Sequence, residues 1–227
     1  MASLTARRPD PEERPDAARI REEIKRVAQD LFIRHGLIKM TLGMVAEELG
    51  MSRPSIHYYY RTKARLAEAV LEDYARISIA RSQENWLDPE TTLAQKFKRS
   101  LDASRERYRF YNARGKGDRP WSLFARFYQE LDLLTPVMET IMKSAAREQQ
   151  SYYGAAVNLA KARGELLPEA PTLDLSVQIV GMLHQVGWLT WASGSFAAVE
   201  TAYATTLTSI QRAYGPAFRA APARARG

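Results

Sequence analysis

The stretch VAEELGMSRPSIHYYYRTK, residues 45–63, decides the fold of the N-terminal part of this chain. Val45 and Leu49 are spaced i and i+4, which places them on one face of a helix, and Ala46 beside them lets another helix approach closely. Gly50 supplies the left-handed residue that a sharp turn requires. The pattern predicts a short helix, a tight turn and a second helix after it.

The second helix of this stretch is predicted to bury one face and expose the other. Ser52 is a good N-cap, and Pro54 falls in the first turn, where a missing amide hydrogen costs nothing. At 100° per residue, a core-facing Ile56 has Tyr60 nearly beside it and Tyr59 at its flank. The outward residues are then Pro54, Ser55, His57 and Tyr58. Two short helices crossing in this way form a helix-turn-helix, whose second helix can enter a DNA major groove.

The run from residue 20 to residue 71 resembles the DNA-binding domain of the TetR (tetracycline-repressor) family. Members usually show a threonine before the second helix, an alanine and a glycine at these offsets, and an aromatic cluster followed by a lysine. The matching residues are Thr41, Ala46, Gly50, Ile56, Tyr58, Tyr60 and Lys63. His57 stands where tyrosine is common in the family, and Tyr59 where histidine is common. The alternative, a purely structural helical hairpin, is disfavoured because spacing, turn residue and exposed donors agree.

DNA contacts are predicted on this resemblance and on the outward face. Arg53 lies at the end of the helix that meets base edges, where it is expected to bind either a guanine edge or a phosphate. Hydroxyl and imidazole groups suit phosphate oxygens and base acceptors, and Thr41 and Lys63 are expected to hold the backbone from the flanks. The predicted DNA-binding residues are Thr41, Ser52, Arg53, Ser55, His57, Tyr58, Tyr59 and Lys63.

The rest of the chain reads as helices separated by polar, glycine- and proline-rich loops. Helices are expected over about 16–36, 42–49, 53–60, 63–86, 91–112, 120–133, 136–163, 172–192 and 195–213. The fold class is therefore all-α, with a small N-terminal unit and a larger C-terminal one. The predicted organisation is a flexible arm (1–15), a helix-turn-helix DNA-binding domain (16–63), a ligand-binding and dimerisation domain (64–215) and a flexible tail (216–227).

Composition excludes several kinds of chemistry. The chain has 227 residues, a formal charge of +7 and no cysteine, so disulfides and thiolate sites are excluded. The three histidines lie far apart in sequence, so neither a metal site nor a cofactor is expected. An N-terminus without an apolar run fits a protein that stays in the cytoplasm. The positive charge by itself only hints at an acidic partner such as DNA.

The last two long helices are predicted to be covered by protein. No charged residue occurs from 175 to 199, yet three glycines and several polar side chains interrupt that stretch too often for a membrane span. Between 175 and 211 the only carboxylate is Glu200, and there is no lysine or arginine. In TetR-like proteins these helices pair with those of a second subunit, so the resemblance implies a homodimer through about 172–192 and 195–213. The alternative is that they form the core of the monomer.

The middle helices are rich in aromatic and methionine residues, which at helical spacing ordinarily form core. TetR-like proteins, however, typically release DNA when a small molecule enters a pocket among such helices. The predicted ligand-binding residues are Trp121, Phe124, Tyr128, Tyr152 and His184. The chain is accordingly predicted to be no enzyme but a repressor released from a palindromic operator by an unknown small-molecule effector. The alternatives are a ligand-independent DNA-binding regulator or activator, and a helical enzyme, for which the sequence offers no phosphate-cradling glycine motif.

Overall fold

The structure is a computed structural model that describes residues 15–113 and 117–216, and within these ranges it contains helices and no strand. The helices are α1 (Pro15–Lys39), α2 (Leu42–Glu48), α3 (Arg53–Tyr59), α4 (Lys63–Trp86), α5 (Leu93–Asn112), α6 (Leu123–Tyr128), a short 3-10 helix η1 (Leu131–Leu133), α7 (Pro136–Ala162), α8 (Thr172–Ser193) and α9 (Ala197–Tyr214). The all-α prediction is confirmed. Nearly all of the predicted arm and tail lies outside the described residues.

The starts of the short helices follow from capping. The side-chain oxygens of Thr41, Ser52 and Thr62 accept from the backbone amides three residues further on, and these bonds satisfy amides that helix geometry leaves free. All three predicted N-caps are confirmed. Thr92 goes further and forms a reciprocal capping box with Gln95 at the start of α5.

Two predicted boundaries differ from the structure. The first helix was expected to stop at Gly36, but α1 resumes after a kink there (φ 72°, ψ −176°) and runs on to Lys39. The segment 120–133 was expected to be one helix, whereas α6 ends at Tyr128 and η1 follows. Glu130 leaves the helical conformation (φ −130°, ψ 40°), and its carboxylate accepts a hydrogen bond from the amide of Leu37 on α1. A tertiary contact thus overrides the local helical pattern.

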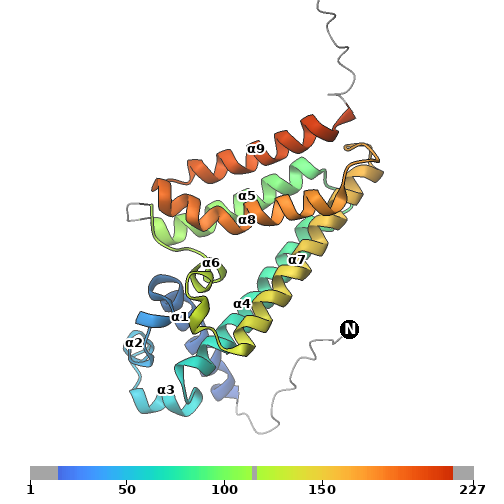
Figure 1. The fold of residues 1–227 in the computed structure, drawn as a ribbon. Coiled ribbons are helices and arrows are strands. Elements are labelled where there is room, and N and C mark those ends of the chain that lie inside the picture. The colour runs from blue at the N-terminus through green and yellow to red at the C-terminus, as the bar shows by residue number, and fades with distance from the viewer. Residues whose placement is uncertain (1–14, 114–116, 217–227) are drawn as a thin grey trace, which may run out of the picture.

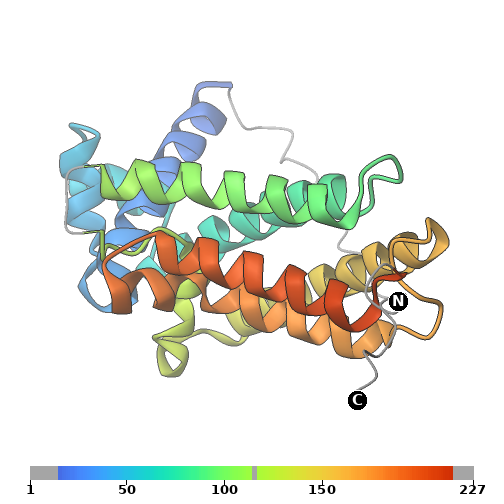
Figure 2. The same ribbon diagram turned by 90° about the horizontal axis from the view of Figure 1, so that it is seen from above.

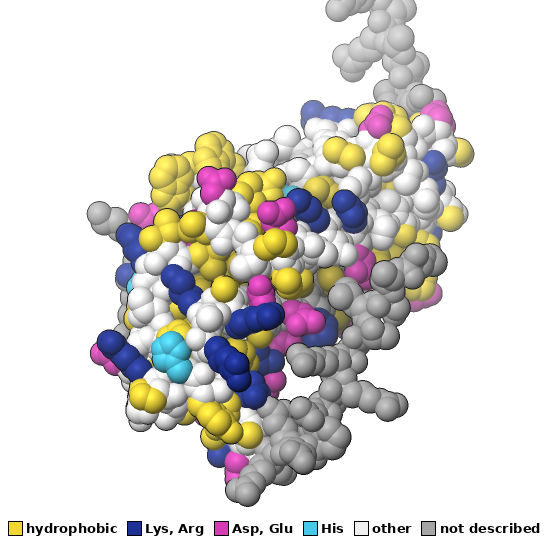
Figure 3. Space-filling model, turned by 60° about the horizontal axis from the view of Figure 1, so that its bottom comes forward, with side chains coloured by type: hydrophobic (Ala, Val, Ile, Leu, Met, Phe, Trp, Pro, Cys, Tyr) yellow, Lys and Arg dark blue, Asp and Glu magenta, His cyan; other side chains and the backbone are white. Residues whose placement is uncertain are grey.

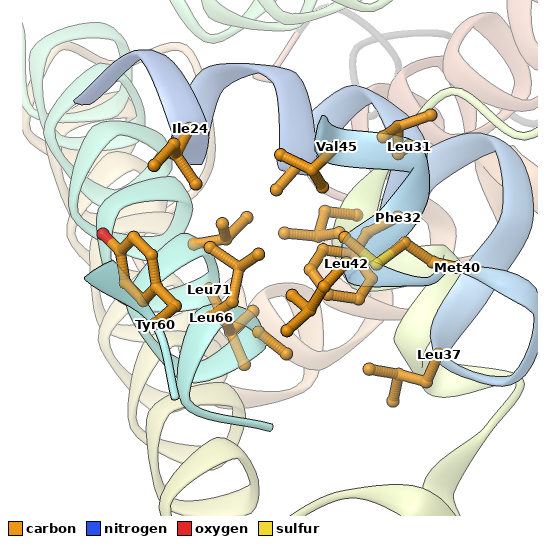
Figure 4. Packing of buried hydrophobic residues seen from close by; sticks show 14 of the residues in the cluster. Ile24, Leu31, Phe32, Leu37, Met40, Leu42, Val45, Tyr60, Leu66 and Leu71 are labelled. Atoms are coloured by element: carbon orange, nitrogen blue, oxygen red, sulfur yellow. The ribbon is translucent and has the colours of Figure 1, made fainter. Parts of the chain in front are cut away.

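Two apolar cores organise the molecule. Helices α1 to α3 and the first half of α4 form one end, called the head here, and α4 and α7 extend from it side by side (Figure 1). Helices α5, α8 and α9 lie together at the other end, called the body (Figure 2). In the head core, side chains from α1, α2 and α4 point toward one another (Figure 4). Leu123 and Phe127 of α6 and Met138 of α7 belong to the same core, so the packing crosses the predicted domain boundary at residue 63.

The stretch without charged residues, from residue 175 to residue 199, is not expected from its sequence to cross a membrane. Within the described ranges, no helix has both the length and the apolarity needed to cross a bilayer.

Candidate nucleic-acid interface

Helix α3 presents a polar face to solvent because Ile56 anchors it in the head core. Ile56 is 0% exposed and Tyr60 is 8% exposed, whereas Tyr58 is 78% exposed. Pro54 and His57 are also exposed, and Tyr59 is half-buried at the flank. The predicted orientation of α3 is confirmed at all of these positions; Ser55, expected to face outward, is half-buried.

Arg53 lies at the N-terminal end of α3 and folds back over α2. The side chain is exposed, and its guanidinium covers Gly43: a Cβ atom at Gly43 would lie 2.9 Å from Arg53 Nε. The Ser52 and Ser55 hydroxyls lie 2.7 Å apart, and Ser52 Oγ accepts from the Ser55 amide at 3.2 Å. Ser52 therefore caps α3, and both serines stay candidates for phosphate contact.

The tyrosines of α3 are held by Arg21 of α1. Arg21 Nη1 donates to the carbonyl of Tyr59 at 3.1 Å, and its guanidinium lies over the rings of Tyr59 and Tyr60. Burial raises the pKa of Tyr60, so its hydroxyl stays protonated. Tyr58 packs edge-on against Tyr59 with ring centroids 5.2 Å apart. Of the three rings, Tyr58 has the freest hydroxyl for an external partner.

Lys63 and Thr41, which are predicted to hold the DNA backbone, both form bonds that support the fold. Lys63 is half-buried, and its Nζ donates to the carbonyls of Leu37 (2.6 Å) and Ile38 (3.4 Å) near the end of α1. These carbonyls have no helical partner of their own, so Lys63 acts as a C-terminal cap for α1. Thr41 is exposed, and its Oγ1 accepts from the amide of Met44.

The face around α3 is predominantly basic. Lys and Arg side chains gather around a histidine on this face (Figure 3). The exposed cations near α3 are Lys39, Arg53, Arg61 and Arg65. The predicted DNA-binding residues did not include Lys39, Arg61 or Arg65, although the position of Arg61 directly after α3 was a usable signal. His57 Nδ1 lies 3.3 Å from the carbonyl of Arg61, which fixes the imidazole beside that arginine.

Two of the predicted ligand-binding residues lie in apolar packing. Trp121 is 1% exposed, and its Nε1 donates to Thr190 Oγ1 of α8 at 2.9 Å. Phe124 is half-buried and packs edge-on against Tyr74 at 5.0 Å. Trp121 therefore joins the segment at the start of α6 to α8, and Phe124 joins α6 to α4.

The other three predicted ligand-binding residues lie apart from these. Tyr128 is 66% exposed at the end of α6. Tyr152 donates to Glu148 Oε1 at 2.6 Å, and partial burial together with this bond raises the pKa of Tyr152 to about 12. His184 is exposed on α8. The five side chains thus face different surroundings, and their role in ligand binding stays a prediction.

Helices α8 and α9 expose a stripe that resembles one half of a helix–helix interface. On α8 the exposed residues recur at spacings of three and four, as Val177, Gly181, His184, Trp188 and Trp191. Trp188 is 57% exposed and Trp191 is 63% exposed, which is unusual for rings of this size. The exposed residues of α9 include several small ones: Ala197, Thr201, Ala204, Thr205 and Thr208.

In the ranges 15–113 and 117–216, no group of three or more His, Asp or Glu side chains could hold a metal ion.

The two short helices, the outward face of α3 and the basic side chains around it define a helix-turn-helix protein of the class that binds double-stranded DNA.

Comparison with known proteins agrees with this class. Residues 24–70 match the family described as bacterial regulatory proteins, tetR family. A probable HTH-type transcriptional regulator, ArpR of Pseudomonas putida, is 31% identical over 78 residues, which are 33% of this chain and 37% of that protein. Residues 24–70 are therefore a DNA-binding domain of the kind found in the tetR family of bacterial regulatory proteins, and the chain spans little more than a third of the length of this curated relative.

Solved structures extend the likeness of fold to most of the chain. A TetR-family transcriptional regulator from Agrobacterium tumefaciens superposes with a TM-score of 0.72 at 16% identity, covering 86% of this chain and 98% of that one. A putative transcriptional regulator from Saccharomonospora viridis, solved in complex with choline, superposes with a TM-score of 0.69 at 15% identity, covering 87% and 98%. At these identities the likeness concerns the fold alone.

Proposed function

We propose that this chain regulates transcription as a repressor, in the form of a homodimer whose two α3 helices read the halves of a palindromic operator. The observation that carries the proposal is the outward polar face of α3, set on the buried Ile56 within the stretch that matches the family. Arg53, His57 and Tyr58 on that face supply donors for phosphates and base edges. The exposed cations around α3 favour the DNA backbone.

Dimerisation is supported by the exposed stripe on α8 and α9. One head contacts too few base pairs to select a single site in a genome. A dimer has two heads, which together contact both halves of a palindrome. The exposed rings of Trp188 and Trp191 would pack over the small α9 residues of a second copy in a symmetric arrangement. Surface of this apolarity is expected to be covered.

Release by a small molecule is the third part of the proposal. A protein of similar fold was solved in complex with choline, which supports the idea that a chain of this fold binds a small molecule. Suppose that a ligand binds the dimer more tightly when the two heads are away from the spacing that the operator requires. It then weakens DNA binding by the difference between its free energies of binding to the two conformations. Quenching of tryptophan fluorescence by candidate compounds tests this part, because a pocket beside Trp121 or Trp188 should respond. A regulator without an effector would show no response.

The central experiment is selection of bound sequences from random double-stranded DNA at physiological salt. We expect a palindrome whose half-sites lie about one helical turn apart, roughly 34–36 Å. The mass of the complex should correspond to one or two dimers. Failure to enrich any sequence, or a monomer at micromolar concentration, would overturn the proposal.

A further inference from the structure

A groove beside the head brings the end of α1, the start of α4 and the segment from η1 to α7 together on one surface. Its volume is about 350 Å³, within the range that small ligands occupy in proteins. Two of its lining side chains are polar, Lys63 at the start of α4 and Thr135 just before α7. The other six are apolar and carry no ring: Leu37, Ile38, Ala64, Ala67, Leu133 and Met138. We call this site the Lys63 groove.

The apolar lining of the groove is open to solvent. Ile38 is 66% exposed and Leu133 is 48% exposed, although both border the same groove. A ligand that covers such surface is favoured because apolar groups leave water. Since the lining offers no ring for stacking, a flexible hydrocarbon chain fits it better than a planar aromatic ligand.

Lys63 supplies the positive charge of the lining. Its Nζ donates to the carbonyls of Leu37 (2.6 Å) and Ile38 (3.4 Å), and both of these residues belong to the groove. An ammonium group has three hydrogens, so at least one remains for a further acceptor. Among the residues that the structure describes, no carboxylate is paired with Lys63. The groove therefore presents an unmatched positive charge next to open apolar side chains.

The neighbouring polar groups favour a ligand with a single negative charge. Thr135 Oγ1 donates to Glu68 Oε1 at 2.7 Å, and Glu68 Oε2 is paired with Arg65 at 3.2 Å. Glu68 follows Lys63 on the same helix, about 7.5 Å further along its axis. One carboxylate at the Lys63 end is attracted, whereas a second carboxylate further along the ligand would approach Glu68 and be repelled.

We propose that the Lys63 groove binds an aliphatic monocarboxylate, with the carboxylate on Lys63 and the hydrocarbon chain over the apolar lining. At the roughly 30 Å³ that a water molecule occupies in the liquid, the groove holds about a dozen heavy atoms, which corresponds to a chain of about ten carbons. Lys63 also flanks α3, so the bound carboxylate competes with DNA phosphates for it and weakens operator binding at the head itself. This competition rests on the proposed function, whereas the binding of the ligand does not.

Binding is tested on the full chain with decanoate below its micelle concentration. Isothermal titration calorimetry gives the affinity, and nuclear magnetic resonance of isotope-labelled methionine methyl groups gives the location. The chain has seven methionines, and Met138→Leu identifies the signal of Met138. We expect this signal to shift, while that of Met182 on α8 stays in place. All four tryptophans lie within the described ranges and none lines the groove, so tryptophan fluorescence should not respond to this ligand.

Related compounds test the chemistry of the site. Octanoate should bind about four- to fifteenfold more weakly than decanoate, because it buries two methylene groups fewer. Decan-1-ol, which lacks the charge, should bind at least about tenfold more weakly. Decyltrimethylammonium has the same chain length and the opposite charge, so it should leave the Met138 signal in place.

Substitutions test the position of the site. Ala64→Phe fills the groove from the exposed start of α4 and should abolish the shift of the Met138 signal. Its matched control, Ala103→Phe, places the same ring on the exposed surface of α5 and should bind decanoate like the wild type. Lys63→Gln should weaken decanoate binding at least about tenfold, whereas Lys63→Arg keeps the charge and should retain most of it. Lys143→Gln, on the exposed surface of α7, is the matched control for loss of a charge.

The unfolding temperature of each variant is measured because Lys63 also caps α1. Ala64→Phe leaves this cap intact, so it decides the test even if Lys63→Gln does not fold.

Competition with DNA is measured by anisotropy titration of the selected operator at a saturating concentration of decanoate. The wild type should bind the operator several-fold more weakly with decanoate, and decan-1-ol should have no effect. The plot of log K against log salt should become less steep by about 0.9 for each phosphate contact that Lys63 loses. Ala64→Phe should bind the operator equally well with and without decanoate.

A Met138 signal that stays in place, or equal decanoate binding by the wild type and Ala64→Phe, would overturn the inference. Decan-1-ol binding as tightly as decanoate would also overturn it, because Lys63 would then play no part. If Ala64→Phe dissociates the dimer in analytical ultracentrifugation, a second copy of the chain covers the groove and the inference fails. Decanoate bound at Met138 without an effect on operator binding would overturn the competition. A wild type that prefers no DNA sequence would instead refute the proposed function and leave the result on ligand binding standing.

Discussion

Substitution of Gly36 by alanine should be among the most costly single changes in the head. Gly36 has φ 72° and ψ −176°, a backbone region that costs other residues about 1–3 kcal/mol. The new Cβ atom would also lie 2.4 Å from Arg126 Nη2 and 2.5 Å from Glu130 Oε1. The hydrogen bonds of Arg126 to the carbonyl of His35 and of Glu130 to the amide of Leu37 must then break, and hydrogen bonds to charged groups contribute about 1.5–3 kcal/mol each. We expect a loss of about 3–6 kcal/mol in the free energy of unfolding.

Gly164→Ala is the control for a glycine of positive φ in open surroundings. Gly164 also has φ 72°, but a Cβ atom there would meet nothing within 4 Å, so the cost should stay near 1–2 kcal/mol. Urea unfolding followed by circular dichroism gives both values. In an Arg126→Ala background, the cost of Gly36→Ala should fall toward its backbone part, because the bond from Arg126 to the carbonyl of His35 is already absent.

The reasoning is refuted if Gly36→Ala costs no more than Gly164→Ala, or if its cost is the same with and without Arg126. Either result would mean that the missing side chain is not what allows α6 to grip α1.

Three further predictions concern DNA reading, assembly and pH. Arg53→Ala should weaken operator binding by about 1–3 kcal/mol more than it weakens binding to random DNA, whereas the control Lys143→Ala on α7 should affect neither. Both affinities are measured by anisotropy titration. Equal losses on the two DNAs would mean that Arg53 contacts only phosphate. Trp188→Ala should weaken the dimer by about 2 kcal/mol or more, seen by analytical ultracentrifugation, and an unchanged monomer–dimer equilibrium would place the interface elsewhere. The backbone amide of Glu90 holds the pKa of Asp88 below its ordinary 3.8, so this carboxylate stabilises the fold above that pH, and the contribution is lost as pH falls below it. Acid unfolding of Asp88→Asn should therefore depend less steeply on pH in that region than that of the wild type.

Local chemistry made the helices predictable. Thr41, Ser52 and Thr62 are capping residues whatever surrounds them, because their side chains bond to amides three residues away. Gly50 has φ 60°, as the predicted sharp turn requires. Once Ile56 is taken as buried, helix periodicity alone fixes which side chains of α3 face outward. The fold class and the candidate DNA-reading face therefore followed from sequence.

Long-range contacts decided the rest. Lys63 was predicted from sequence as a DNA contact, and only the structure shows that its ammonium also bonds to carbonyls 26 and 25 residues away. The segment 120–133 has a helical pattern, but Glu130 leaves the helix to reach Leu37, 93 residues earlier. Sequence by itself determined what depends on neighbours within a turn or two of helix. Only the tertiary structure decided which polar side chains form hydrogen bonds within the protein, because their partners come from parts of the chain that folding brings together.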